Sequence, residues 1–200
     1  GLEFIAHELR KVPEAVEMAH VCIITFSSSA TVHTPLTSVM DLKPLKVSCG
    51  GGTDMASGLR LLDAQINQDF RPTFKGKARG DYKPTIFLLT DGEPNNLNDT
   101  IEASQALRNR KSGHGIGNFI AVGCGPDVNE DNLKQVAPIV AMMFNMTSEN
   151  IKNFFKWVSA SVVVASKSAS QAVGGTGEVN ADAPPVPKDD DGQPAFKFTF

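Results

Sequence analysis

Residues 85–94 read TIFLLTDGEP, a short apolar run that ends in an Asp-Gly turn. The run does not alternate with polar residues, which is typical of a strand buried on both faces of a parallel sheet. Asp91 follows this predicted strand directly. Because ligands of open α/β sheets gather at the carboxyl ends of the strands, Asp91 is a candidate binding residue. The alternative is that the Asp-Gly pair only forms a turn, which is a common use of these residues.

Similar apolar runs occupy residues 21–26, 119–122 and 139–144. Apolar residues also recur at helical spacing over about 54–68, 98–111 and 148–165, which predicts helices there. Residues 30–36 alternate and contain Pro35, so we expect an edge strand that closes a hairpin through Ser27, Ser28 and Ser29. This order predicts a three-layer α/β fold: a mostly parallel central sheet with one antiparallel edge strand, and helices on both faces.

The two ends of the chain differ from its middle. We expect one domain over residues 1–166, followed by a flexible linker over 167–195, where Gly, Pro, Ser and Asp abound and Leu, Ile, Met and aromatic residues are absent. The last residues, 196–200, read FKFTF and alternate like a short strand that could return to the sheet. Apolar residues at helical spacing begin directly after Gly1, so we expect further sequence upstream.

Composition excludes several classes of function. Lys and Arg total 19 and Asp and Glu 22, so a net charge of −3 gives no attraction to nucleic acid or to an anionic membrane. No apolar run approaches the ~18 residues that a membrane span needs. The cysteines Cys22, Cys49 and Cys124 show no CxxC spacing, which argues against disulfides and zinc and indicates the cytoplasm. The motifs GxSxG, GxxxxGK[ST] and HExxH are absent, so we expect no enzyme.

A second loop contains polar residues that could bind a ligand. Residues 49–54 read CGGGTD and lead into the first predicted helix. Glycines allow a tight backbone, which could bring the Thr53 hydroxyl close to another group. The alternative is that Thr53 or Asp54 merely caps the helix.

Together the two loops resemble the metal-ion-dependent adhesion site of von Willebrand factor A (vWA) domains. Gly51, Gly52 and Thr53 match one part of that site, and Thr90, Asp91 and Gly92 match another. The segments 21–26, 89–94 and 154–158 are most similar to bacterial tellurium-resistance proteins of the TerY type. The third part of the family's site, a DxSxS motif after the first strand, does not occur in this chain. The resemblance places that strand and motif upstream of Gly1; otherwise the site is incomplete.

The resemblance implies a protein-binding module and not an enzyme. Thr53 and Asp91 would hold Mg²⁺ or Mn²⁺, since hydroxyl and carboxylate oxygens suit these ions. A carboxylate from a partner protein would complete the coordination, and the TerY type implies kinase-like or phosphatase-like partners in tellurite or metal stress. The expected rim of the site consists of Ser27, Ser28, Ser29, Glu93, Asn95, Asn96 and Asp127. Two alternatives remain: a metal-independent scaffold with a decayed site, and a Mg²⁺-dependent phosphoryl enzyme that uses Asp91.

Overall fold

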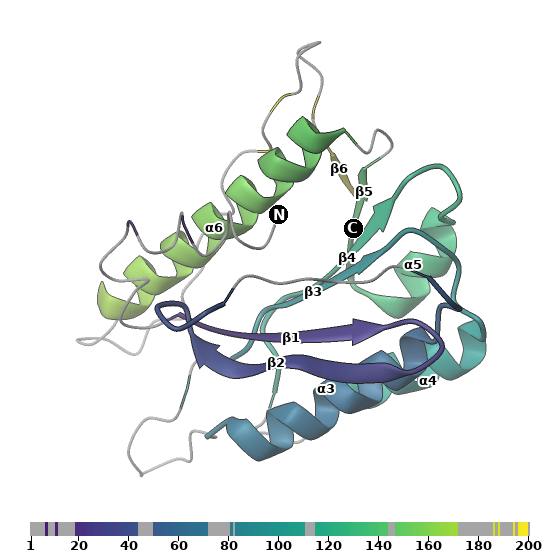
Figure 1. Cartoon of the computed structure of the whole chain (residues 1–200), viewed down its shortest axis with the longest axis horizontal. Coiled ribbons are helices and arrows are strands. Elements are labelled where there is room, and N and C mark those ends of the chain that lie inside the picture. Colours follow the sequence, from purple (N-terminus) through teal and green to yellow (C-terminus); the bar gives the residue numbers. More distant parts are fainter. Residues whose placement is uncertain are drawn as a thin grey trace. The chain divides into compact units, whose positions relative to one another are not determined.

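The computed structural model describes residues 7, 11, 19–43, 50–71, 81, 83–110, 115–143, 147–171, 186, 188, 194 and 196–199, without the side chains of 162–171 and 199. The strands are β1 (His20–Phe26), β2 (Ala30–Ser38), β3 (Ile86–Thr90), β4 (Phe119–Cys124), β5 (Ile139–Met143) and β6 (Lys197–Thr199). The helices are α3 (Met55–Asp69), α4 (Leu97–Arg108), α5 (Glu130–Val136) and α6 (Ser148–Gln171) (Figure 1). The helix expected directly after Gly1 lies outside the described residues.

The strands form two sheets within the described part of the chain. β1 and β2 make a hairpin, and the second sheet has the order β3-β4-β5-β6. β3 runs parallel to β4 and β4 parallel to β5, with Thr90 opposite Gly123 and Gly123 opposite Met142. This register brings the carboxyl ends of β3 and β4 to the same edge of the sheet. The prediction of a mostly parallel sheet with helices between its strands is confirmed.

The chain divides into two units. Unit 1 contains Gly1–Ile23, Thr34–Val47 and Asn145–Lys197, and unit 2 contains Ile24–His33, Ser48–Phe144 and Phe198–Phe200. The core of unit 2 joins α3, α4 and α5 to β3, β4 and β5, and all residues of β4 are buried. α3 and α4 lie side by side (Figure 1). All candidate site residues named from the sequence belong to unit 2.

Two helices differ from the sequence-based expectations. α5 was not expected, because at seven residues it is too short to show a helical period, although Asn129 provides a cap for its first turn. α6 continues to Gln171, so residues 167–171 of the expected linker are helical. Ser, Ala, Lys and Gln permit this extension, and no Gly or Pro interrupts the chain before Gly174.

The C-terminal segment folds back. β6 lies next to β5 at the edge of the four-stranded sheet, where the sequence predicted a returning strand. In unit 1, Phe196 is only 2% exposed and contacts the rings of Phe154 and Trp157, with centroid distances of 5.6 and 5.5 Å. These edge-to-face contacts hold the start of the segment in place. No helix in the described residues is long and apolar enough to cross a membrane.

Candidate functional site

The turn that follows β3 is closed by its own threonine. Thr90 is buried, and its hydroxyl donates to the carbonyl of Gly92 at 2.9 Å and accepts from the Gly92 N–H at 3.3 Å. These two short-range bonds tighten the chain around Asp91, whose side chain is exposed. Asp91 therefore lies at the carboxyl end of β3, as the sequence predicted.

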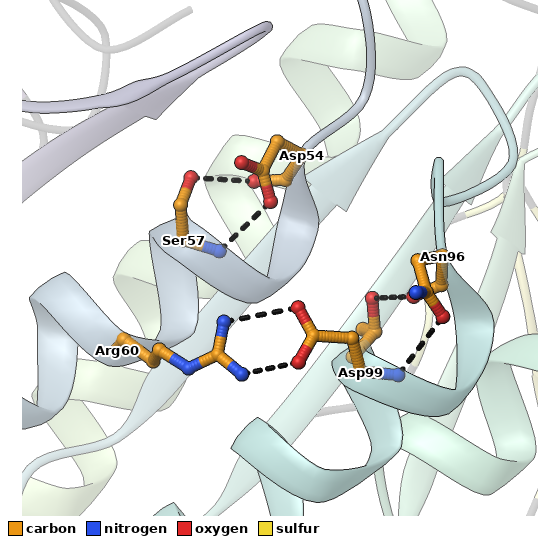
Figure 2. A network of polar contacts seen from close by, with 6 residues as sticks. Asp54, Ser57, Arg60, Asn96 and Asp99 are labelled. Carbon is orange, nitrogen blue, oxygen red and sulfur yellow. Dashed lines mark hydrogen bonds and ion pairs between the residues drawn. The ribbon is translucent and has the colours of Figure 1, made fainter.

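The glycine loop before α3 needs glycine for two different reasons. Gly51 has a φ of +96°, a conformation that side chains rarely adopt. Gly52 lies against Asn95, since a Cβ added there would be 2.8 Å from the Asn95 Nδ2 atom. The loop then enters α3 through Asp54, whose carboxylate accepts from the Ser57 N–H at 3.0 Å (Figure 2). The helix cap is therefore Asp54, and the Thr53 side chain is not needed for capping.

Hydrogen bonds link this glycine loop to the hairpin turn between β1 and β2. The Gly52 N–H donates to the Ser28 hydroxyl at 3.0 Å, and the Asp54 N–H donates to the Ser27 carbonyl at 2.6 Å. The same glycine loop is bound on its other side by Asn95, which lies on the loop after β3. There the Thr53 N–H donates to Asn95 Oδ1, and the Asn95 N–H donates to the Thr53 carbonyl, both at 2.9 Å.

A further pair of bonds joins the loop after β3 to the start of α5. The two carboxylate oxygens of Glu93 accept from the N–H of Asn129 and from the side-chain amide of Asn132, both at 2.5 Å. Bonds to a charged acceptor are the stronger kind. The hairpin turn, the glycine loop, the loop after β3 and the start of α5 thus form one connected edge of unit 2.

The fold brings Thr53 and Asp91 to the same place. A Cβ built on Gly92 would be 3.4 Å from the Thr53 hydroxyl oxygen, so this hydroxyl lies directly against the turn that carries Asp91. Neither the Thr53 hydroxyl nor the Asp91 carboxylate has a hydrogen-bond partner among the described residues. The Thr53 hydroxyl and the Asp91 carboxylate, which belong to adjoining loops, are therefore available to an external ligand.

Cys124, at the end of β4, provides a second indication of where the Asp91 charge lies. Burial is the main reason that the pKa of this thiol is raised to about 11, and the negative charge of Asp91 adds to the effect. The register explains the proximity, because Thr90 pairs with Gly123. The Cys124 thiol is protonated at neutral pH and is not a nucleophile or a metal ligand in this state.

Most of the expected rim residues make bonds inside the chain. Ser28, Glu93 and Asn95 join loops as described above, and the carbonyl of Ser27 does the same, while the N–H of Ser27 donates to Ser29. Asn96 caps α4 by accepting from the Asp99 N–H at 3.1 Å (Figure 2). Asp127 lies exposed on the loop between β4 and α5. The binding of a partner by these residues stays a prediction.

A pair of charges stabilises the two helices that start at this edge. Arg60 of α3 and Asp99 of α4 form a bidentate ion pair (Figure 2). The hydrogen bond from Arg60 is the main reason that the pKa of Asp99 is lowered. Asp99 also belongs to the first turn of α4, where a negative charge favours the helix. This pair is satisfied within the chain, so it supports the helices and offers no free charge to a ligand.

The donor set limits which metals are chemically possible. In the described part of the chain, no group of three or more His, Cys, Asp or Glu side chains could hold a metal ion. The pair formed by Thr53 and Asp91 offers one hydroxyl and one carboxylate, which fit a hard cation such as Mg²⁺ and not a soft one. With these residues alone, most coordination positions would belong to water or to another protein group.

Comparison with known proteins gives one family and one fold. The family model described as "von Willebrand factor type A domain" matches residues 2–157. No curated protein matches the chain.

Among solved structures, proximal thread matrix protein 1 from the mussel byssus is similar with a TM-score of 0.56 and 18% identity, over 79% of this chain and 40% of that chain. Its second crystal form gives 0.53 and 16%, over 79% and 41%. This chain therefore spans about two fifths of that protein, and at this identity the likeness shows the fold alone. With the parallel strands and intervening helices, these findings confirm the predicted three-layer α/β fold.

Proposed function

Since the chain belongs to the von Willebrand factor type A domain family, a family of interaction modules that are generally non-enzymatic, we propose that it binds a protein partner through a metal held by Thr53 and Asp91. The metal is Mg²⁺ or Mn²⁺. The observation that carries the proposal is the position of the Thr53 hydroxyl against the Asp91 turn, with neither side chain engaged by a described residue.

The chemistry of a bound Mg²⁺ explains why such a site would serve binding. This ion prefers oxygen ligands and keeps several waters, so a carboxylate from a partner could replace one of them. Thr53 supplies a neutral donor and Asp91 a charged one. Because Glu93 is already bound to Asn129 and Asn132, it does not compete for the ion. The partner is therefore a protein that presents an Asp or Glu side chain to this edge.

The tellurium-resistance role belongs to the same proposal. It rests on the likeness of the segments 21–26, 89–94 and 154–158 to TerY-type proteins, and it predicts kinase-like or phosphatase-like partners. Binding of such a partner should require metal and should be lost in EDTA.

Metal binding can be measured before any partner is known. Titration of the full chain with Mn²⁺, followed by the EPR signal of the free ion, should show one site in the wild type. Thr53→Ala and Asp91→Ala should each lower the affinity at least about tenfold, the loss that follows when even supporting residues of metal sites are removed. Thr53→Ser, which keeps the hydroxyl, should bind as the wild type does.

The matched control is Asp41→Ala, which removes an exposed carboxylate from unit 1 and changes the net charge equally. It should leave Mn²⁺ affinity unchanged. Water-proton relaxation of the Mn²⁺ complex should fall when acetate is added, because a carboxylate then replaces a bound water. Equal affinities in Asp91→Ala and Asp41→Ala would contradict the proposed site.

A metal-independent scaffold is the second candidate. It is favoured by the absence of a three-ligand His, Cys, Asp or Glu cluster from the described residues. Under this function the same loop edge would bind its partner directly, and neither EDTA nor the two substitutions that remove the donors would change the affinity for that partner.

A further inference from the structure

Asn95 binds residue 53 twice. Its side-chain Oδ1 accepts from the Thr53 N–H, and its own N–H donates to the Thr53 carbonyl, both at 2.9 Å. Both polar groups of the Thr53 backbone are thus held by one residue that is 42 positions away in the sequence. The two residues lie on different loops, so the bonds determine how these loops lie relative to each other.

Gly52, which precedes Thr53, leaves room for the Asn95 side chain because it has no Cβ. A Cβ at position 52 would be 2.8 Å from Asn95 Nδ2, too close without a shift of one of the two groups, and 3.2 Å from Oδ1, which is a tight contact. The amide of Asn95 therefore lies directly over the α-carbon of Gly52. Three consecutive glycines would otherwise leave this loop free to adopt many conformations, since glycine has the largest backbone freedom.

Asn95 lies on the same short loop as Asp91, between β3 and α4. A residue on this loop that holds Thr53 also holds it at a given position relative to Asp91. The Thr53 hydroxyl is directed to the Asp91 turn, next to Gly92. A metal ion needs both donors within narrow distance limits, so the loop that carries Thr53 must be ordered before the ion binds.

We propose that Asn95 is a positioning residue: it fixes Thr53 against the Asp91 turn and so presents the two donors to one cation. This inference rests on the proposed metal site. It assigns Asn95 a role inside the site, which the sequence did not predict. Residues that orient metal ligands through hydrogen bonds commonly change affinity by about 10–100-fold when they are removed.

The test compares two asparagines of the same edge in the full chain. Asn95→Ala removes the side-chain bond to Thr53. Asn132→Ala removes one of the two bonds to Glu93 on the same loop, but Glu93 keeps its bond from the Asn129 N–H and Thr53 is untouched. Mn²⁺ affinity should fall about 10–100-fold in Asn95→Ala and stay at the wild-type value in Asn132→Ala. Thermal melts of both variants verify that the protein is folded at the temperature of the titration.

A second readout does not depend on metal. Hydrogen exchange of the Thr53 amide, measured by NMR without metal, should become roughly 2–10-fold faster in Asn95→Ala, which corresponds to the loss of one ordinary hydrogen bond. Asn95→Asp keeps an acceptor at this position, so its exchange should remain slow. A change in global stability alone would alter all slow amides together and would not single out Thr53.

The outcomes separate the two proposals. Wild-type affinity in Asn95→Ala, or an unchanged Thr53 amide, would overturn the positioning role and leave the metal site standing. A wild-type chain that binds no Mn²⁺ would overturn the metal site, and with it the role of Asn95 in forming that site.

Discussion

Gly123 lies at the centre of the sheet edge that carries the candidate site, and Gly123→Ala should destabilise the protein. Gly123 is in β4, between Thr90 of β3 and Met142 of β5. An added Cβ would be 2.7 Å from the sulfur of Met142 and 2.9 Å from a methyl carbon of Val128. The Met142 side chain can rotate away, but Val128 is branched at Cβ and stiff, so the strand or the loop after it must shift.

Two opposing effects set the magnitude. Overpacking of a well-packed core costs about 1–3 kcal/mol. Replacing glycine by alanine also restricts the unfolded chain, which returns about 0.4–1 kcal/mol where the backbone has no positive φ, as at Gly123. The free energy of unfolding should therefore fall by about 1–2 kcal/mol, the difference between these ranges near their centres.

Urea unfolding followed by circular dichroism measures this difference, and Gly115→Ala is the control. Among the described residues, a Cβ on Gly115 would meet only Lys83, at 3.9 Å, so this variant should be as stable as the wild type or slightly more stable. Adding Val128→Ala to Gly123→Ala should cost less than the sum of the two single changes, because it removes the clashing methyl group. A Gly123→Ala protein as stable as Gly115→Ala, or strictly additive losses in the double variant, would refute the steric explanation.

Two further predictions concern residues around the site. The pKa of the Cys124 thiol is raised from 9.0 to about 11, mainly by burial and further by the charge of Asp91. Between these two pH values the thiol keeps its proton in the native state and loses it in the unfolded state. Stability present below pH 9 should be lost as the pH rises to 11, by roughly 2–3 kcal/mol; urea unfolding of Cys124→Ala should lack this loss, and parallel pH curves for the two proteins would contradict it. Asn96→Ala should lower the free energy of unfolding by about 0.5–2 kcal/mol because it removes the cap of α4, whereas Asn96→Asp should unfold at the same urea concentration as the wild type.

Much of the fold follows from local sequence. The apolar runs at 21–26, 86–89, 119–122 and 139–144 become β1, β3, β4 and β5, with ends shifted by one or two residues. The expected burial on both faces holds for β4 and nearly for β5, where apolar side chains are needed at every position. It is wrong for β1, which is only half-buried, and for β3, where Leu89 is exposed. The start of α3 is equally local, since an Asp that binds an N–H three residues later makes a cap.

Other features depend on residues that are distant in sequence. In the helix predicted over 148–165, Phe154, Phe155 and Val158 belong to one apolar stripe and Trp157 lies off it. Trp157 is nevertheless only 4% exposed, because Phe196 packs against it. No periodicity could predict a contact made by a segment that returns after a stretch without aromatic residues. The sequence did not predict α5 for a local reason: its seven residues are too few to repeat a helical pattern.

The candidate site divides in the same way. The sequence by itself determined that Thr53 follows a run of glycines and that Asp91 follows a strand, because glycines and strand ends are local features. Only the tertiary structure decided that Asn95 holds the Thr53 backbone and that Glu93 binds the start of α5. An asparagine or glutamate on a loop can bind a partner protein or its own chain with the same groups. Which of these it does depends on the loop that packs beside it, and that neighbour is set by the order of the strands in the sheet.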